Sequence, residues 1–228
     1  MNSNIKVGRI VGALFLTLMI AYSIGAFVLI DPVLSGTDYL SGISTHRTRI
    51  MLGVVLELVN GFAYIGIAVL VFPLLKTYSE TLALAYLAFR IVEFVMQIIS
   101  DLSPLLLTSL SEFSAISAST DPSSLHYLGS QILALRHWAN EMVFLNYALG
   151  AIIFYYWLFE TNLVPRFLAT WGLVAAPLIL ANVLLEIFGY KEVVLFGLIM
   201  GLNEIALGIW LLVKGFRSEV MMPPTGQI

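Results

Sequence analysis

Residues 82–107 have the sequence LALAYLAFRIVEFVMQIISDLSPLLL, an apolar run interrupted by a few polar residues. At 1.5 Å per residue, the run is long enough to cross about 30 Å of hydrocarbon as a helix. The polar residues recur at helical spacing and therefore share one face, which forms a stripe along most of the helix. They are Arg90, Glu93, Gln97 and Asp101. Because a bilayer tolerates such groups only when they are paired, protonated, hydrated or functional, the stripe predicts a bundle of membrane helices.

The composition of the whole chain points the same way. Of its 228 residues, 60% are hydrophobic and 11% are charged. In a typical soluble domain about 45–50% of residues are apolar and about 25% are charged. These values exclude a soluble globular enzyme and a disordered tail, and the net charge of −3 excludes a basic nucleic-acid-binding surface. The chain contains no cysteine, which excludes disulfides, Fe–S clusters and thiolate zinc sites. No cofactor is predicted.

Six segments are apolar and long enough to span a bilayer. They comprise residues 8–30, 50–75, 82–107, 138–159, 166–188 and 192–214. The sequence therefore predicts one all-α integral membrane domain over residues 1–228, a polytopic bundle of six transmembrane helices. Residues 108–136 are expected to form a Ser-rich extracytoplasmic loop with a short helix that starts at Asp121-Pro122 and either lies in the interface or extends the fourth helix. The placement of Lys and Arg puts both termini in the cytoplasm.

Carboxyl groups outnumber cations inside the predicted membrane helices. The carboxyl groups are those of Glu57, Glu93, Glu141, Glu186 and Glu204. Arg90 is the one buried cation that the segment boundaries predict. These carboxyl groups cannot all be ionised in a dry site, so some must be protonated, hydrated or bound to a cation.

The candidate ligand- or ion-binding residues are Glu57, Asn60, Arg90, Glu93, Glu141, Asn203 and Glu204. Arg90 and Glu93 are three residues apart, so they form either a structural ion pair or a site in which Arg90 holds an anionic group of a substrate. Gly197, Gly201 and Gly208 flank Glu204 and allow a close approach by another helix.

His137 and Glu141 lie one helical turn apart, which is the spacing of two metal ligands on one helical face. A solvated pair at the membrane interface explains the same spacing. No metal is assigned, because nitrogen and oxygen ligands suit several divalent ions.

Four stretches resemble a family of bacterial membrane proteins known as domain of unknown function four-three-eight-six. They are LELVNGFAYIGIAVLVFPLL (56–75), LALAYLAFRIVEFV (82–95), IIFYYWLFETNLVPRFLATWGLV (152–174) and NEIALGIWLLVKGF (203–216). The resemblance extends over nearly the whole chain. It implies a multi-pass protein with six helices in the bacterial cytoplasmic (inner) membrane, and it implies no activity.

Three functions remain open at this stage. The first is binding of an ion or small solute, for transport or sensing, at the polar residues that meet near the midplane. Six helices are few for a monomeric transporter, an objection that a homodimer would answer. The second is an intramembrane enzyme that acts on a lipid or isoprenoid, although no known catalytic motif is present. The third is an accessory or scaffold protein whose polar groups only specify helix packing.

Overall fold

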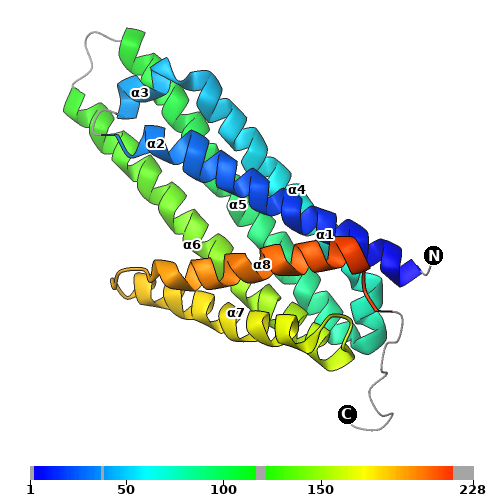
Figure 1. Cartoon of the computed structure of the whole chain (residues 1–228). Helices are drawn as coiled ribbons and strands as arrows, with labels where there is room; N and C mark the ends of the chain where they lie inside the picture. Colours follow the sequence, from blue (N-terminus) through cyan, green and yellow to red (C-terminus); the bar gives the residue numbers. More distant parts are fainter. Residues whose placement is uncertain (1–2, 37–38, 117–121, 218–228) are drawn as a thin grey trace.

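The computed structural model describes residues 3–36, 39–116 and 122–217 (Figure 1). Helices account for most of the described residues, which contain no strand. The elements are α1 (Ser3–Tyr22), the π-helix η1 (Ser23–Ile30), α2 (Asp31–Leu34), α3 (Tyr39–Thr45), α4 (Arg47–Tyr78), α5 (Glu80–Ile116), α6 (Pro122–Thr161), α7 (Arg166–Ile187) and α8 (Val194–Lys214).

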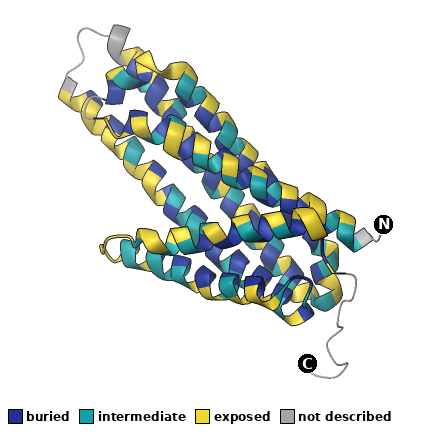
Figure 2. Cartoon of the chain, in the orientation of Figure 1, coloured by how far each residue is buried: buried dark blue, intermediate teal, exposed yellow. Residues whose placement is uncertain are grey.

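Six of the helical segments are long and apolar enough to cross a membrane. The first joins α1, η1 and α2 over Asn4–Leu34, and the other five lie in α4, α5, α6, α7 and α8. Many large apolar residues of these helices are exposed, and exposed residues lie along the outward sides of the helices (Figure 2). An apolar outer surface is what a helix surrounded by lipid requires. The predicted fold class, a polytopic all-α bundle with six membrane helices, is confirmed.

The six segments form a closed ring in chain order. α1 packs against α4, α4 against α5, α5 against α6, α6 against α7 and α7 against α8, which returns to α1. The long helices α4, α5 and α6 run along α1, whereas α7 and α8 form a hairpin that is inclined to them (Figure 1). All six segments therefore contribute to the interior of the ring.

Glycines close the ring between α1 and α8. A Cβ added to Gly12 would collide with the backbone nitrogen of Leu212, and a Cβ added to Gly208 would lie 3.0 Å from a side-chain atom of Leu16. The close approach predicted from the α8 glycines is thus present at Gly208. At Gly197, toward the other end of α8, no atom lies within 4 Å of an added Cβ. The packing around α8 is therefore tight at one end and open at the other.

Helices α5 and α6 are longer than the sequence predicted. α5 continues to Ile116 and α6 begins at Pro122, so most of residues 108–136, which we expected to form a Ser-rich loop, is helical. The proposed short helix is the first part of α6 and extends the fourth membrane helix; Asp121 lies outside the described residues. Hydroxyl side chains fit both helices because they can bond to a backbone carbonyl one turn back, as Thr108 of α5 does to the carbonyl of Pro104 at 2.8 Å.

Candidate functional site

Buried polar side chains form a layer between two apolar cores. On α4, one core ends at Val54 and the other begins at Ala63, and Glu57 and Asn60 lie between them. The corresponding stretches of α5 and α6 are also polar, and we call the whole set the polar layer. Its members are Glu57, Asn60, Arg90, Glu93, Gln97, Ser100, Asp101, Arg136 and Glu141, each less than 9% exposed. The predicted stripe along residues 82–107 therefore faces the interior.

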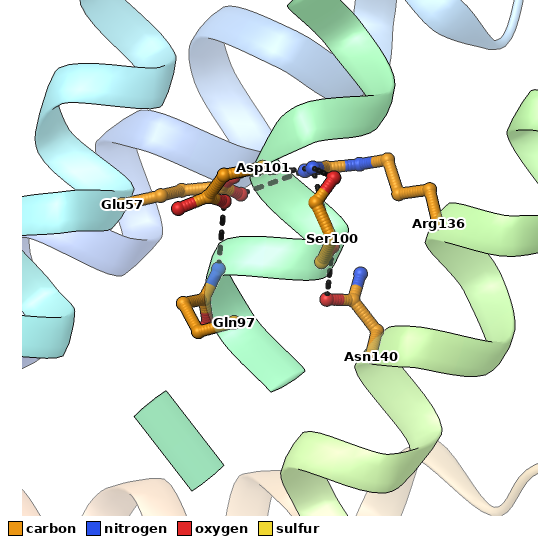
Figure 3. A network of polar contacts seen from close by, with 6 residues as sticks. All are labelled: Glu57, Gln97, Ser100, Asp101, Arg136 and Asn140. Atoms are coloured by element: carbon orange, nitrogen blue, oxygen red, sulfur yellow. Dashed lines mark hydrogen bonds and ion pairs between the residues drawn. The ribbon is translucent and has the colours of Figure 1, made fainter. Parts of the chain in front are cut away.

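Arg136 of α6 and Glu57 of α4 form an ion pair within this layer (Figure 3). Arg136 Nη2 donates to Glu57 Oε1 at 2.7 Å, and Nη1 donates to Oε2 at 3.2 Å. Two parallel bonds from one guanidinium are stronger and more directional than a single contact. Because the side chains are only 6% and 2% exposed, bulk water does not screen the pair.

A second carboxyl group adjoins this ion pair. Asp101 of α5 lies beside Glu57 (Figure 3), and its Oδ1 accepts a hydrogen bond of 2.8 Å from Gln97. Its buried Oδ2 atom has no hydrogen-bond partner. Arg136 pairs with Glu57, and its charge also acts on Asp101, so the group of Glu57, Asp101 and Arg136 depends on Arg136 for its charge balance.

Arg90 occupies a separate part of the layer. Its Nη1 atom donates to both carboxylate oxygens of Glu93, at 2.9 and 3.1 Å. Its guanidinium carbon lies 5.3 Å from the ring centres of both Tyr86 and Tyr147, within the range of cation–π attraction. Its Nε atom faces Gly150, where an added Cβ atom would lie 3.5 Å from it. Glu93 and two tyrosine rings therefore contact the Arg90 guanidinium, whereas its buried Nε atom has no hydrogen-bond partner among the described residues.

Tyr147 connects the Arg90 region to α8. Its hydroxyl donates to Glu204 Oε1 at 2.8 Å. Glu204 is 7% exposed, so α8 contributes a largely buried carboxyl group to the same region as Arg90 and Glu93.

A cavity of about 510 Å³ lies inside the ring, next to these groups. Its polar lining includes Asn60, Arg90, Glu93, Gln97, Asn140, Glu141, Asn182, Glu192 and Glu204. Its aromatic lining includes Phe15, Tyr22, Phe27, Tyr64, Tyr86, Phe144 and Tyr147. Gly197 and Gly201 also line it, so the open end of α8 leaves room for it. The remainder of the lining is largely aliphatic, and the cavity is therefore apolar with a few ionisable groups.

Two hydrogen bonds link the wall of this cavity to the Glu57–Arg136 ion pair. Gln97 bonds to Asp101, and the Ser100 hydroxyl donates to Asn140 Oδ1 at 2.8 Å (Figure 3). Arg136 in turn contacts Ser100 at 3.4 Å. Gln97 and Asn140 line the cavity, so one polar network runs from the cavity wall to the buried ion pair.

Most of the residues singled out from the sequence belong to this region. Asn60, Arg90, Glu93, Glu141 and Glu204 line the cavity. Glu57 lies behind the cavity wall, in the ion pair with Arg136.

Asn203 is placed differently from the other candidates. It is fully buried, and its side-chain amide donates to the backbone carbonyl of Leu168 at 3.0 Å. This bond ties α8 to α7, and Asn203 is not part of the cavity lining.

The prediction of one buried cation was wrong, because Arg136 is a second one. We had placed Arg136 in the loop before the fourth helix, whereas α6 begins well before it. Its helical register with Asn140 and Tyr147, at i+4 and i+11, is a signal that could have identified it. Tyr147, whose hydroxyl joins Glu204 to the Arg90 region, was also not among the residues predicted from the sequence.

His137 and Glu141 lie close together, as their spacing predicted, and Glu186 of α7 joins them. His137 Nε2 lies 3.3 Å from Glu186 Oε1. We call these three residues the α6–α7 triad.

Comparison with known proteins identifies the family. The family model described as Domain of unknown function (DUF4386) matches residues 10–215, which is most of the chain, and the chain belongs to this family. No curated protein and no solved structure matches it.

Proposed function

We propose that this multi-pass membrane protein binds a small, largely apolar organic cation in the cavity that its six membrane segments line. The observation that carries the proposal is the charge of the cavity lining. Among the described residues, four carboxyl groups line the cavity, those of Glu93, Glu141, Glu192 and Glu204, and Arg90 is the one guanidinium or ammonium group that does so.

The engagement of Arg90 makes an anionic solute less suitable. Its guanidinium is bonded to Glu93 and lies over two tyrosine rings. A cation could bind to the other carboxyl groups of the cavity, those of Glu141, Glu192 and Glu204. Such binding would break fewer existing contacts than the binding of an anion to Arg90. The position of Arg90 thus favours the structural interpretation of the Arg90–Glu93 pair over substrate binding.

The size and surface of the cavity favour an organic solute over a bare ion. A volume of about 510 Å³ is within the range of pockets for small organic molecules, roughly 300–1,000 Å³. A single ion needs only a few close oxygen ligands. Aromatic rings such as those of Tyr22, Tyr64 and Phe144 line the cavity, and such rings attract organic cations through their faces.

The same arrangement suits a protein that carries or senses its solute across a bacterial cytoplasmic membrane. In the proposed orientation both termini face the cytoplasm, so the α7–α8 connection and the α5–α6 connection lie outside. Glu141 and Glu192 then stand at the outer part of the cavity, where they would meet a cation that arrives from outside.

Thermal unfolding of the purified protein in detergent tests this proposal. Tetraphenylphosphonium is the probe, and tetraphenylborate has a similar shape and the opposite charge. A ligand at 100 times its Kd stabilises the folded state by about 2.7 kcal/mol. For a chain of this size that corresponds to an increase in Tm of roughly 5–11 °C.

We expect the phosphonium ion to raise the Tm of the wild type and of Glu160→Gln, an exposed glutamate at the end of α6. We expect no increase in Tm for Glu204→Gln. A larger increase with tetraphenylborate than with tetraphenylphosphonium would contradict the proposal and return Arg90 to consideration as an anion ligand.

A further inference from the structure

The α6–α7 triad lies beside the cavity and is separate from the Arg90 region. His137 and Glu141 are one turn apart on α6, and Glu186 is contributed by α7. One ligand atom of each lies within 4.8 Å of the other two. The three side chains belong to two packed helices of the ring, so the helix packing holds them together.

The charged groups closest to Glu141 are other carboxyl groups. Glu141 is 8% exposed, and the charged groups that act on it are the carboxylates of Glu186 and Glu192. Its side-chain hydrogen-bond partner is the carboxyl group of Glu186, and among the described residues no Lys, Arg or His forms an ion pair with it. A largely buried carboxyl group beside two further carboxyl groups is stabilised by a bound cation.

The ligand types and one distance fit a first-row transition metal ion. Imidazole and carboxylate both bind Zn²⁺, at about 2.0–2.2 Å, which places neighbouring ligand atoms of a tetrahedral site about 3.4 Å apart. His137 Nε2 and Glu186 Oε1 are 3.3 Å apart. The longest separation in the triad is at most 4.8 Å, and side-chain rotation of Glu141 can shorten it.

We propose that His137, Glu141 and Glu186 bind a divalent transition metal ion of the Zn²⁺ class. Three protein ligands leave a fourth position open, as in zinc sites that hold water or another exchangeable group. Glu141 also lines the cavity, so the ion is bound at the cavity edge. Glu141 is shared with the proposed organic-cation site, whereas His137 and Glu186 do not line the cavity, so Zn²⁺ binding can be tested at these two residues without the organic cation.

Metal titration of the purified full-length protein tests the site. The protein carries no polyhistidine tag and is first treated with a chelator. Zn²⁺ binding is measured by calorimetry, and Co²⁺ serves as a spectroscopic probe because its visible absorption reports ligand geometry. The variants are His137→Gln and Glu186→Gln, at half-exposed and partly exposed positions, where folding should be retained. His126→Gln is the control, because His126 is exposed on the same helix and outside the triad.

We expect one Zn²⁺ per chain in the wild type and in His126→Gln, and at least tenfold weaker binding in each triad variant. The intense visible bands of four-coordinate Co²⁺ should be lost in the same variants. Binding that is equal in the wild type and both triad variants would overturn the proposal, as would the absence of stoichiometric Zn²⁺ binding by the wild type. Retention of the circular dichroism spectrum confirms that a variant is folded.

Discussion

Removal of the Arg136 charge is the most informative test of the polar layer. Arg136→Met leaves the carboxyl groups of Glu57 and Asp101 buried side by side without a guanidinium (Figure 3). Loss of one partner of a buried ion pair costs about 3–5 kcal/mol. Since 1 kcal/mol corresponds to roughly 2–4 °C for a chain of this length, the Tm should fall by about 6–20 °C.

Substitution of Glu57, the other partner of the ion pair, should lower the stability less. Glu57→Gln leaves Arg136 beside Asp101, a second carboxylate that can take over as its partner (Figure 3). The expected cost is that of one charge-assisted hydrogen bond, about 1.5–3 kcal/mol. The double variant, with both Glu57→Gln and Arg136→Met, should also be more stable than Arg136→Met alone. In the double variant, Asp101 is the one carboxyl group of the pair that lacks a cation.

Thermal unfolding in detergent, followed by tryptophan fluorescence, measures all three variants under one condition. Arg47→Met is the matched control, because Arg47 pairs with Glu112 at 2.6 Å on the surface, where the side chains are 62% and 49% exposed. Such pairs contribute about 0–1 kcal/mol. A cost for Arg136→Met no larger than that of Arg47→Met would refute the reasoning, and so would a larger cost for Glu57→Gln.

Three further predictions concern the cavity, the helix packing and the orientation. Glu204→Gln retains an acceptor oxygen for its partner Tyr147, so the free energy of unfolding should change by less than about 1 kcal/mol while phosphonium binding is lost. Unfolding and binding assays on one preparation check this. A large loss of stability would indicate a structural role for Glu204. Gly12→Ala places a Cβ against the α8 backbone and should lower stability by about 1–3 kcal/mol. The added Cβ of Gly197→Ala has no atom within 4 Å, so this substitution should raise stability by up to about 1 kcal/mol. Similar effects of the two substitutions in unfolding assays would contradict the packing described. The chain lacks cysteine, so a membrane-impermeant maleimide applied to intact cells should label Tyr127→Cys, and should label Lys76→Cys only after permeabilisation; the opposite pattern would reverse the orientation.

The membrane helices could be predicted from the sequence because their signals are local. A long apolar run fixes the existence of a helix, and the spacing of Arg90, Glu93, Gln97 and Asp101 fixes which face turns inward. The structure buries all four side chains. The boundary between α5 and α6 was less certain, because serine-rich sequence is compatible with a loop and also with a helix whose hydroxyls bond one turn back.

The partners of the polar groups could not be predicted in the same way. Glu57 and Arg136 are 79 residues apart in the chain, and no local pattern joins them. Tyr147 is indistinguishable in sequence from an apolar core residue until Glu204 is seen beside its hydroxyl. The cavity depends on the packing around α8, which is tight at Gly208 and open at Gly197, so it is a property of the packed bundle.

The position of a bound organic cation tests the central claim most directly. Tetraphenylarsonium has the charge and nearly the shape of tetraphenylphosphonium, and its arsenic atom can be located by anomalous X-ray scattering in crystals of the complex. The cavity proposal predicts one arsenic peak per chain within the ring, between α1, α6 and α8 and near Tyr147 and Glu204. Arsenic peaks confined to the lipid-facing surface, with the cavity free of the cation, would contradict it.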